Sequence, residues 1–184
     1  MRSACVPPNT HAYLPSKKHV AAKTVAAVTS VLIAVLLTAW ALPASAASLS
    51  RSVEVDSTPS QIWSAIGPFC AIQDWHPAIG TCTEDGKTPS TRTLVTKDGK
   101  ATFVELQTAQ NPQMHEYSYA FVSSPLPVTN YRSTLKVTAK GGDRSVITWS
   151  GEYTPDHGKE AAAVEALSGI YESGLQAIKI RFEK

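Results

Sequence analysis

The spacing of apolar residues divides the chain after residue 46 into three parts. Apolar residues recur at every second position from residue 49 to 55, apart from Arg51, and predict a strand with one buried face. The same alternation, interrupted by turn signals, continues from 78 to 154 and predicts a series of antiparallel strands. Beyond residue 160, a spacing of three and four predicts one helix of roughly six turns. Its expected inward residues are Val164, Leu167, Tyr171, Leu175, Ile178 and Phe182.

Two short helices are expected between the first strand and the others. Thr58 suits the N-cap of the first helix, Pro59 its first position, and Gln61 the partner position of a capping box. Gly67-Pro68 ends that helix after about two turns. The stretch 69–75 predicts a second short helix, which stops at a His-Pro pair because the residue before proline avoids the helical region.

The register of the central hairpin follows from its turn. Asp98-Gly99 is a strong signal for a two-residue hairpin loop. The register that this turn sets places Arg92 opposite Glu105, two side chains of opposite charge. The same register places Leu94 opposite Phe103.

The register of the last hairpin follows from its two faces. A two-residue turn at the Gly-Gly pair would mix apolar and polar side chains, whereas a three-residue loop over 141–143 separates them. We therefore predict the second register. The pairs that it forms are Leu135 with Trp149 and Val137 with Ile147.

The first 46 residues have the order of a secretory signal peptide. A basic stretch precedes an uncharged run from 24 to 40, and Ala44 and Ala46 then supply the A-x-A pattern of signal peptidase cleavage. The run is a little short for a membrane span, which needs about 20 apolar residues, and an uncleaved anchor is the alternative. We expect a signal peptide at 1–46 and an exported domain at 47–184, periplasmic or secreted, with no membrane span after cleavage.

Cleavage would change both the charge and the cysteine count. The whole chain carries 17 Lys and Arg against 15 Asp and Glu, a net charge of +2. The leader holds four of the basic residues, so 13 basic and 15 acidic residues remain and nucleic acid is not an expected partner. Cleavage also removes Cys5 and leaves Cys70 and Cys82, an even number that favours a disulfide in an exported chain.

Several segments of the exported domain carry a resemblance to a known superfamily. In chain order they are SVEVDSTPSQIWSAIGPF, WHP, RTLVT-DGK-TFVEL, YSYAFVSSPLPVTNY, ITWSGEYTP and IYESGLQAIK. They resemble bacterial members of the polyketide cyclase/dehydrase and lipid-transport superfamily, also called SRPBCC or START-like. The resemblance implies an α+β helix-grip fold, in which a curved antiparallel sheet of about six to seven strands surrounds the long C-terminal helix. It also implies an internal cavity that binds an apolar or amphipathic small molecule.

The candidate ligand-binding residues are aromatic and charged side chains that this fold would place near the cavity. They are Trp75, His76, Arg92, Glu105, Tyr117, Tyr119, Tyr131 and Trp149. A tyrosine hydroxyl in an apolar cavity needs a partner that a ligand oxygen can provide, although such rings can equally fill the core. The Arg92–Glu105 pair has two interpretations, a polar floor of the cavity or an ordinary pair on the solvent face. We favour the solvent face.

Catalysis has weaker support, and no catalytic residue is assigned. His76 and Glu105 are the weak candidates for a base, while residues 47–184 contain no G-x-S-x-G, H-x-x-x-H or C-x-x-C motif. A Cys70–Cys82 disulfide would remove both thiolates as metal ligands, so neither a metal nor a cofactor is expected.

Three functions remain open on this evidence. The favoured one is an exported, non-enzymatic protein that binds a hydrophobic or amphipathic small molecule. The alternatives are a cyclase, dehydratase or isomerase that uses the same cavity, and a periplasmic accessory protein that acts through a partner protein.

Overall fold

A single antiparallel sheet forms the frame of the structure. The computed structural model describes residues 45–183, so only the last two residues of the predicted signal peptide fall within that range. The sheet has seven strands in the order β1-β7-β6-β5-β4-β3-β2. The strands are β1 (Ala47–Val55), β2 (Ile79–Glu84), β3 (Thr91–Thr96), β4 (Thr102–Asn111), β5 (Glu116–Ser123), β6 (Val128–Gly141) and β7 (Arg144–Pro155).

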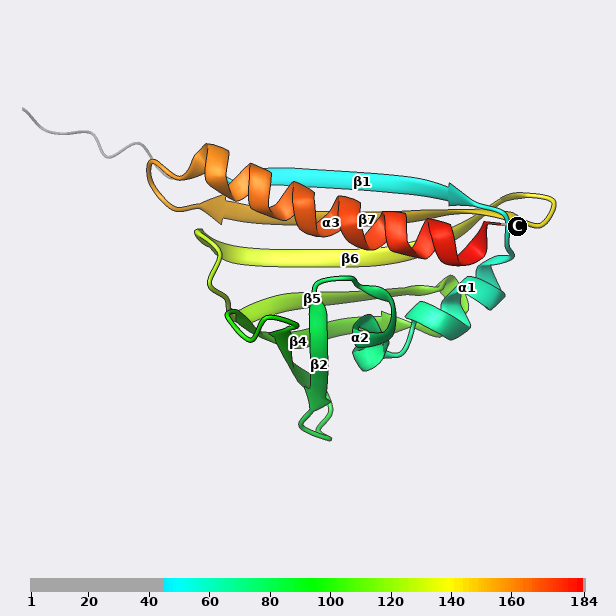
Figure 1. Cartoon of the computed structure of the whole chain (residues 1–184), viewed down its shortest axis with the longest axis horizontal. Helices are drawn as coiled ribbons and strands as arrows, with labels where there is room; N and C mark the ends of the chain where they lie inside the picture. Colours follow the sequence, from blue (N-terminus) through cyan, green and yellow to red (C-terminus); the bar gives the residue numbers. More distant parts are fainter. Residues whose placement is uncertain (1–44, 184) are drawn as a thin grey trace, which may run out of the picture. The chain divides into compact units, whose positions relative to one another are not determined.

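The long helix α3 (Glu160–Phe182) lies along one face of this curved sheet, as Figure 1 shows in orange and red. The short elements after the first strand are α1 (Pro59–Ile66), the 3-10 turn η1 (Phe69–Ala71) and α2 (Ile72–Trp75); a further 3-10 turn, η2 (Pro112–Met114), precedes β5. This arrangement confirms the α+β helix-grip prediction. Among residues 45–183, no helix has the length and apolar character that crossing a bilayer requires.

The local signals for α1 are confirmed. The side chain of Thr58 accepts a hydrogen bond from the backbone N–H of Gln61, and the Gln61 side chain accepts one from the backbone N–H of Thr58. This reciprocal capping box satisfies two of the N–H groups that a helix start leaves without partners. The predicted second helix is present as the consecutive turns η1 and α2.

Both hairpin registers are confirmed. Arg92 pairs with Glu105 and Leu94 with Phe103 across β3 and β4. In the last hairpin the strand pairs also match the prediction, but the loop differs. Gly141 pairs directly with Arg144, and an irregularity between residues 139 and 141 restores the register. The buried face therefore fixed the register, and a bulge rather than a longer loop accommodates it.

The buried face of helix α3 differs from the predicted face at its first turn. Leu167, Tyr171, Leu175 and Ile178 are buried as predicted, but Val164 is 45% exposed and Ala163 is buried instead. Successive spacings of four residues shift the buried stripe around a helix of 3.6 residues per turn. The first turn therefore presents the residue before the valine to the sheet.

Gly174 permits a close contact between α3 and the rest of the core. A Cβ atom at this position would lie 2.7 Å from Cδ2 of His76 and 2.8 Å from a ring carbon of Trp149. Both rings are buried. The missing side chain thus lets the helix settle on two aromatic groups.

We predict that Gly174→Ala destabilises the protein although alanine favours helix formation. The added methyl group would overpack the core at a cost of about 1–3 kcal/mol, which exceeds the gain of up to about 1 kcal/mol in helix propensity. Gly169→Ala is the matched control, because nothing lies within 4 Å of its added Cβ. Urea unfolding should show lower stability for Gly174→Ala and higher stability for Gly169→Ala; equal shifts would contradict the close contact.

Candidate ligand-binding site

A small, partly open cavity of about 80 Å³ lies between the sheet, the segment that follows η1, and α3. Its wall is mostly apolar. The residues that line it are Ile72, His76, Ala78, Ile79, Leu94, Thr96, Phe103, Glu105, Tyr119, Phe121, Tyr131, Trp149, Leu167 and Ile170. Such an apolar wall with a few polar groups is typical of small-molecule sites, although pockets for drug-sized ligands measure about 300–1,000 Å³.

The structure brings the predicted site residues together but in two layers. Those that line the cavity are His76, Glu105, Tyr119, Tyr131 and Trp149. The other three, Trp75, Arg92 and Tyr117, are buried behind the wall. The second layer packs against the first, since the rings of Trp75 and Trp149 meet edge to face at 5.7 Å.

The solvent-face interpretation of Arg92 and Glu105 is wrong. Arg92 is 0% exposed and Glu105 is 4% exposed. Both alternate along their strands with Leu94 and Phe103, which are buried as well. Because side chains two residues apart share one face of a strand, the charged pair has to follow its apolar neighbours into the interior.

Arg92 connects three parts of the site. Its Nε donates to Oε2 of Glu105 at 2.6 Å, and its Nη1 donates to the carbonyl oxygen of Phe69. Its guanidinium carbon lies 4.0 Å from the centre of the Phe69 ring and 5.1 Å from that of Tyr119, within the range of cation–π contacts. Burial by itself lowers the pKa of Arg92, but the Glu105 carboxylate together with Tyr117 and Tyr119 outweighs burial, and the pKa is raised.

Glu105 is the carboxylate of the cavity wall. Burial raises its pKa, and the adjacent guanidinium of Arg92 opposes that rise. A guanidinium does not lose its proton in proteins, and within residues 45–183 Arg92 has no ion pair with another carboxylate. Neutral Glu105 would leave a buried, uncompensated cation, so the ionic form of the pair is the one that the surroundings favour at neutral pH.

Four hydroxyl groups and one indole form a connected network beside the cavity. The indole Nε1 of Trp149 lies 3.0 Å from both the hydroxyl of Tyr119 and Oγ of Ser133. The hydroxyl of Tyr171 lies 2.7 Å from that of Tyr131 and 3.1 Å from Oγ of Ser133. Burial raises the pKa of each tyrosine in the network, so all three hydroxyls carry their protons.

Ser133 and the hydrogen bonds of Tyr171 were not predicted from the sequence. Tyr171 was expected in the core, which is where its ring stacks on Trp149 at 4.6 Å. Ser133 follows Tyr131 by two residues and precedes Leu135 by two, so it belongs to the buried face of β6. That alternation was the available signal, and a serine among buried aromatic residues needs a hydrogen-bond partner.

His76 fastens the segment after α2 to helix α3. Its Nδ1 accepts a hydrogen bond from the N–H of Ala78, so the proton of the neutral ring is on Nε2, which donates to the carbonyl oxygen of Ile170 at 3.0 Å. Burial lowers the pKa of His76, and Lys97 and Arg92 lower it further, while the bond to Ile170 opposes the shift. Both ring nitrogens therefore form hydrogen bonds within the protein, although the ring itself lines the cavity.

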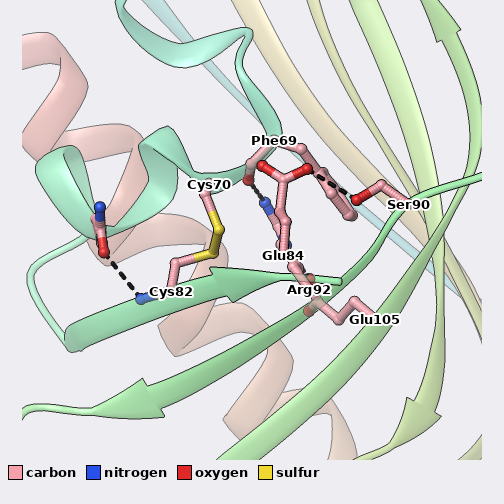
Figure 2. The surroundings of a disulfide bond; sticks show 8 residues. Phe69, Cys70, Cys82, Glu84, Ser90, Arg92 and Glu105 are labelled. Carbon is pink, nitrogen blue, oxygen red and sulfur yellow. Dashed lines mark hydrogen bonds and ion pairs between the residues drawn. A yellow bond between two sulfur atoms is a disulfide. The ribbon is translucent and has the colours of Figure 1, made fainter. Parts of the chain in front are cut away.

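A disulfide fastens the other side of the same segment, which we call the lid segment (residues 69–78). Cys70 and Cys82 are bonded, as predicted. Figure 2 shows this bond joining the helical turn to β2, with Arg92 directed at the carbonyl of Phe69 nearby. The side chain of Gln73 also accepts from the N–H of Cys82 at 2.8 Å. The lid segment is thus held to β2, to β3 and to α3.

A surface groove meets the cavity at the lid segment. The groove, of about 600 Å³, runs between this segment and the outer side of α3. The groove and the cavity share His76, Ala78 and Ile170. These residues therefore form the partition between the cavity and the outside. No three His, Cys, Asp or Glu side chains gather at a common point among residues 45–183.

Fold and cavity together define a helix-grip protein of the START-like class. The chain belongs to the family described as polyketide cyclase / dehydrase and lipid transport, whose profile matches residues 46–183. Among solved structures, the protein XoxI from Bacillus cereus is 33% identical to it with a TM-score of 0.70, over 74% of this chain and 95% of that one.

Two enzymes share the fold at lower identity. Norcoclaurine synthase from Thalictrum flavum is 18% identical with a TM-score of 0.60, over 77% of this chain and 96% of that one. The ZhuI aromatase/cyclase from Streptomyces sp. R1128 is 13% identical with a TM-score of 0.61, over 74% and 93%. A comparison with curated proteins gave no significant match. These two enzymes have the same fold as this chain. A shared fold does not imply a shared reaction, so the function of this chain has to be inferred from its own side chains.

We predict that removing one member of the Arg92–Glu105 pair destabilises the protein far more than removing both. Arg92→Met leaves a buried carboxylate without its partner and should cost about 3–5 kcal/mol, whereas Arg92→Met with Glu105→Leu should cost clearly less. The exposed Arg51–Glu172 pair has the same 2.6 Å separation and is the control; Arg51→Met should cost less than about 1 kcal/mol. Urea unfolding of these variants measures the differences, and additive costs at Arg92 and Glu105 would refute the coupling.

We also predict that His76 contributes to the pH dependence of stability. Its folded pKa lies below the ordinary value of 6.5, so the unfolded chain takes up the proton first as the pH falls. The contribution of His76 to the free energy of unfolding is therefore complete above the ordinary pKa of 6.5 and is lost as the pH falls below it. The loss amounts to up to about 1.4 kcal/mol between about pH 7.5 and 5.5.

His76→Gln should lose less unfolding free energy between about pH 7.5 and 5.5 than the unchanged protein does. This expectation holds whatever the effect of the substitution on stability at the upper pH. His157→Gln, at an exposed position before α3, is the matched control. Urea unfolding at both pH values provides the readout. A loss that persists undiminished in His76→Gln would assign the effect to other groups.

Proposed function

We propose that this chain binds a small, largely apolar molecule in the cavity between the sheet and α3. The observation that carries the proposal is an apolar cavity whose wall contains a buried, paired carboxylate, Glu105. Burying a charge costs free energy unless the surroundings compensate it. A carboxylate kept at a cavity wall in this way is a natural polar contact for a ligand.

The size of the cavity limits what it can enclose. About 80 Å³ is enough for a small ring or a short branched group, and not for a whole drug-sized molecule. A larger ligand would place one end in the cavity and extend past the partition formed by His76, Ala78 and Ile170 into the surface groove. The hydrogen bond from His76 to the carbonyl oxygen of Ile170 would then have to open for the ligand to enter.

We propose further that the protein acts after export. The support is the predicted leader at 1–46 together with the Cys70–Cys82 disulfide, a bond that persists in oxidising compartments. A periplasmic protein partner stays a prediction. Among residues 45–183, the exposed large apolar side chains are scattered: Met114 lies in η2, Val122 in β5, and Val164 and Ile180 more than four turns apart on α3.

A second candidate function is proton transfer in the same cavity. Glu105 lines the cavity and burial raises its pKa, which is the combination expected of a general acid or base. His76 contributes less to this candidate, because both of its nitrogens are already hydrogen-bonded within the protein.

Native mass spectrometry of the protein isolated from its own host tests these proposals together. We predict a chain that begins at Ala47 and carries a bound small molecule. Leu94→Phe enlarges a cavity-lining side chain and should lower occupancy by at least about tenfold, since overpacking leaves no room for the ligand. Leu126→Phe makes the same change outside the cavity wall and should leave occupancy unchanged.

The outcomes separate the candidates. Equal occupancy in Leu94→Phe and Leu126→Phe would move the ligand away from this cavity, and a protein that never carries a molecule would count against binding as its function. For proton transfer, Glu105→Gln should accumulate a bound molecule of different mass from that in the unchanged protein. The same mass in both supports a carrier.

A further inference from the structure

The polar side chains of the cavity wall differ sharply in what they can still offer a ligand. They are His76, Thr96, Glu105, Tyr119, Tyr131 and Trp149. A ligand group needs either a free proton or a free lone pair opposite it. Tracing each proton of these side chains therefore shows which ligand chemistry the cavity accepts.

The hydroxyl network has only one order in which every proton finds an acceptor. The hydroxyl of Tyr119 contacts Tyr131 at 3.3 Å and otherwise only the indole N–H of Trp149, which is itself a donor, so Tyr119 donates to Tyr131. Tyr131 must then donate to Tyr171.

The network ends at a backbone carbonyl. Tyr171 donates to Oγ of Ser133, and Ser133 donates to the carbonyl oxygen of Ser150 at 2.7 Å. The indole N–H of Trp149 starts the network and cannot accept, while the carbonyl ends it and cannot donate. In this order, every proton of Tyr119, Tyr131 and Trp149 is used inside the protein.

The remaining donors are used as well. His76 donates its single ring proton to the carbonyl oxygen of Ile170. The hydroxyl of Thr96 donates to a carboxylate oxygen of Asp98 at 2.6 Å and accepts from the N–H of Ala101. Among the side chains that line the cavity, no donor is left for a ligand.

Glu105 is different, because one of its oxygens remains available. Its Oε2 accepts from Arg92, and within residues 45–183 no side-chain donor is hydrogen-bonded to Oε1. The pair is already balanced in charge, so a ligand cation would add an uncompensated charge. A ligand anion would meet a carboxylate and no free donor among the side chains that line the cavity. A neutral ligand fits both conditions.

We propose that the ligand is an uncharged apolar molecule that carries a hydroxyl or N–H group, and that Glu105 accepts its proton in a hydrogen bond. The inference rests on the proposed function and narrows it to a substrate class. Carboxylates are excluded, and so are molecules whose only polar group is a carbonyl, since a carbonyl oxygen would be buried without a donor.

Four small aromatic probes of similar size test the inference on the purified protein. Phenol has one donor, fluorobenzene has none, benzaldehyde has a carbonyl acceptor, and benzoate is an anion. Binding is followed by NMR through the indole N–H signal of Trp149, which lies in the cavity wall. Phenol should bind at least about tenfold more tightly than each of the others, because a hydrogen bond to a charged acceptor is worth that much.

The outcomes distinguish the two levels of the proposal. If none of the probes moves the Trp149 signal, the cavity does not bind small apolar molecules and the proposed function fails. If fluorobenzene, benzaldehyde or benzoate binds as tightly as phenol, the function stands and the inference about ligand class is wrong.

A variant provides a second, independent measurement. Glu105→Gln replaces the acceptor with an amide that can also donate, so the preference for phenol over benzaldehyde should shrink at least about fivefold. Ser90→Ala, at a partly exposed position outside the cavity wall, is the control and should keep the preference of the unchanged protein. An unaltered preference in Glu105→Gln would show that this carboxylate does not select the ligand, and if that variant fails to fold the probe series on the unchanged chain still decides.

Discussion

The buried ion pair between Arg92 and Glu105 is the constraint on which the site depends. A guanidinium with no exposed surface needs an anion and further acceptors. Arg92 finds the anion in the neighbouring strand and one acceptor in the carbonyl of Phe69, while its Nη2 has no hydrogen-bond partner among residues 45–183. One cation therefore fixes the first residue of the lid segment, the pairing of β3 with β4, and the position of a carboxylate at the cavity wall. Replacing the pair with apolar side chains could leave a stable fold, but it would remove the only charge that faces the cavity among residues 45–183.

The lid segment is held by bonds of unequal strength, and this decides where the cavity can open. The Cys70–Cys82 disulfide and the Arg92 contact restrain the side that faces β2 and β3. The side that faces α3 has one hydrogen bond, from His76 to the carbonyl oxygen of Ile170, and the contact of His76 with Gly174. A covalent bond does not open in thermal motion, whereas a hydrogen bond does so at a modest cost in free energy. Opening without unfolding is thus confined to the partition between the cavity and the groove.

Most of the fold could be predicted from the sequence because its signals are local or periodic. The capping box of Thr58 and Gln61 acts within one turn, and the strand registers follow from a turn and an alternating face. The burial of Arg92 and Glu105 was missed because a cross-strand pair has the same register on either face. Their phase with Leu94 and Phe103 was the evidence that should have outweighed the usual preference of charge for solvent. The part played by Ser133 could not be predicted, since it depends on side chains of four elements that meet only in three dimensions.

The network also changes the meaning of the tyrosines. Their number near the cavity suggested hydroxyl groups that are free to bind a ligand. In the proposed order of donors, from Trp149 to the carbonyl of Ser150, every proton is instead used within the protein. The rings supply apolar surface and rigidity, and Glu105 alone among the lining side chains keeps an open polar position. Specificity in such a cavity comes mainly from rejection, because a ligand group buried without its partner loses far more free energy than a good hydrogen bond adds. This chain shares its fold with cyclases and with norcoclaurine synthase. The class of ligand that it binds can still differ from theirs, because it depends on which hydrogen-bonding positions in the cavity wall remain free.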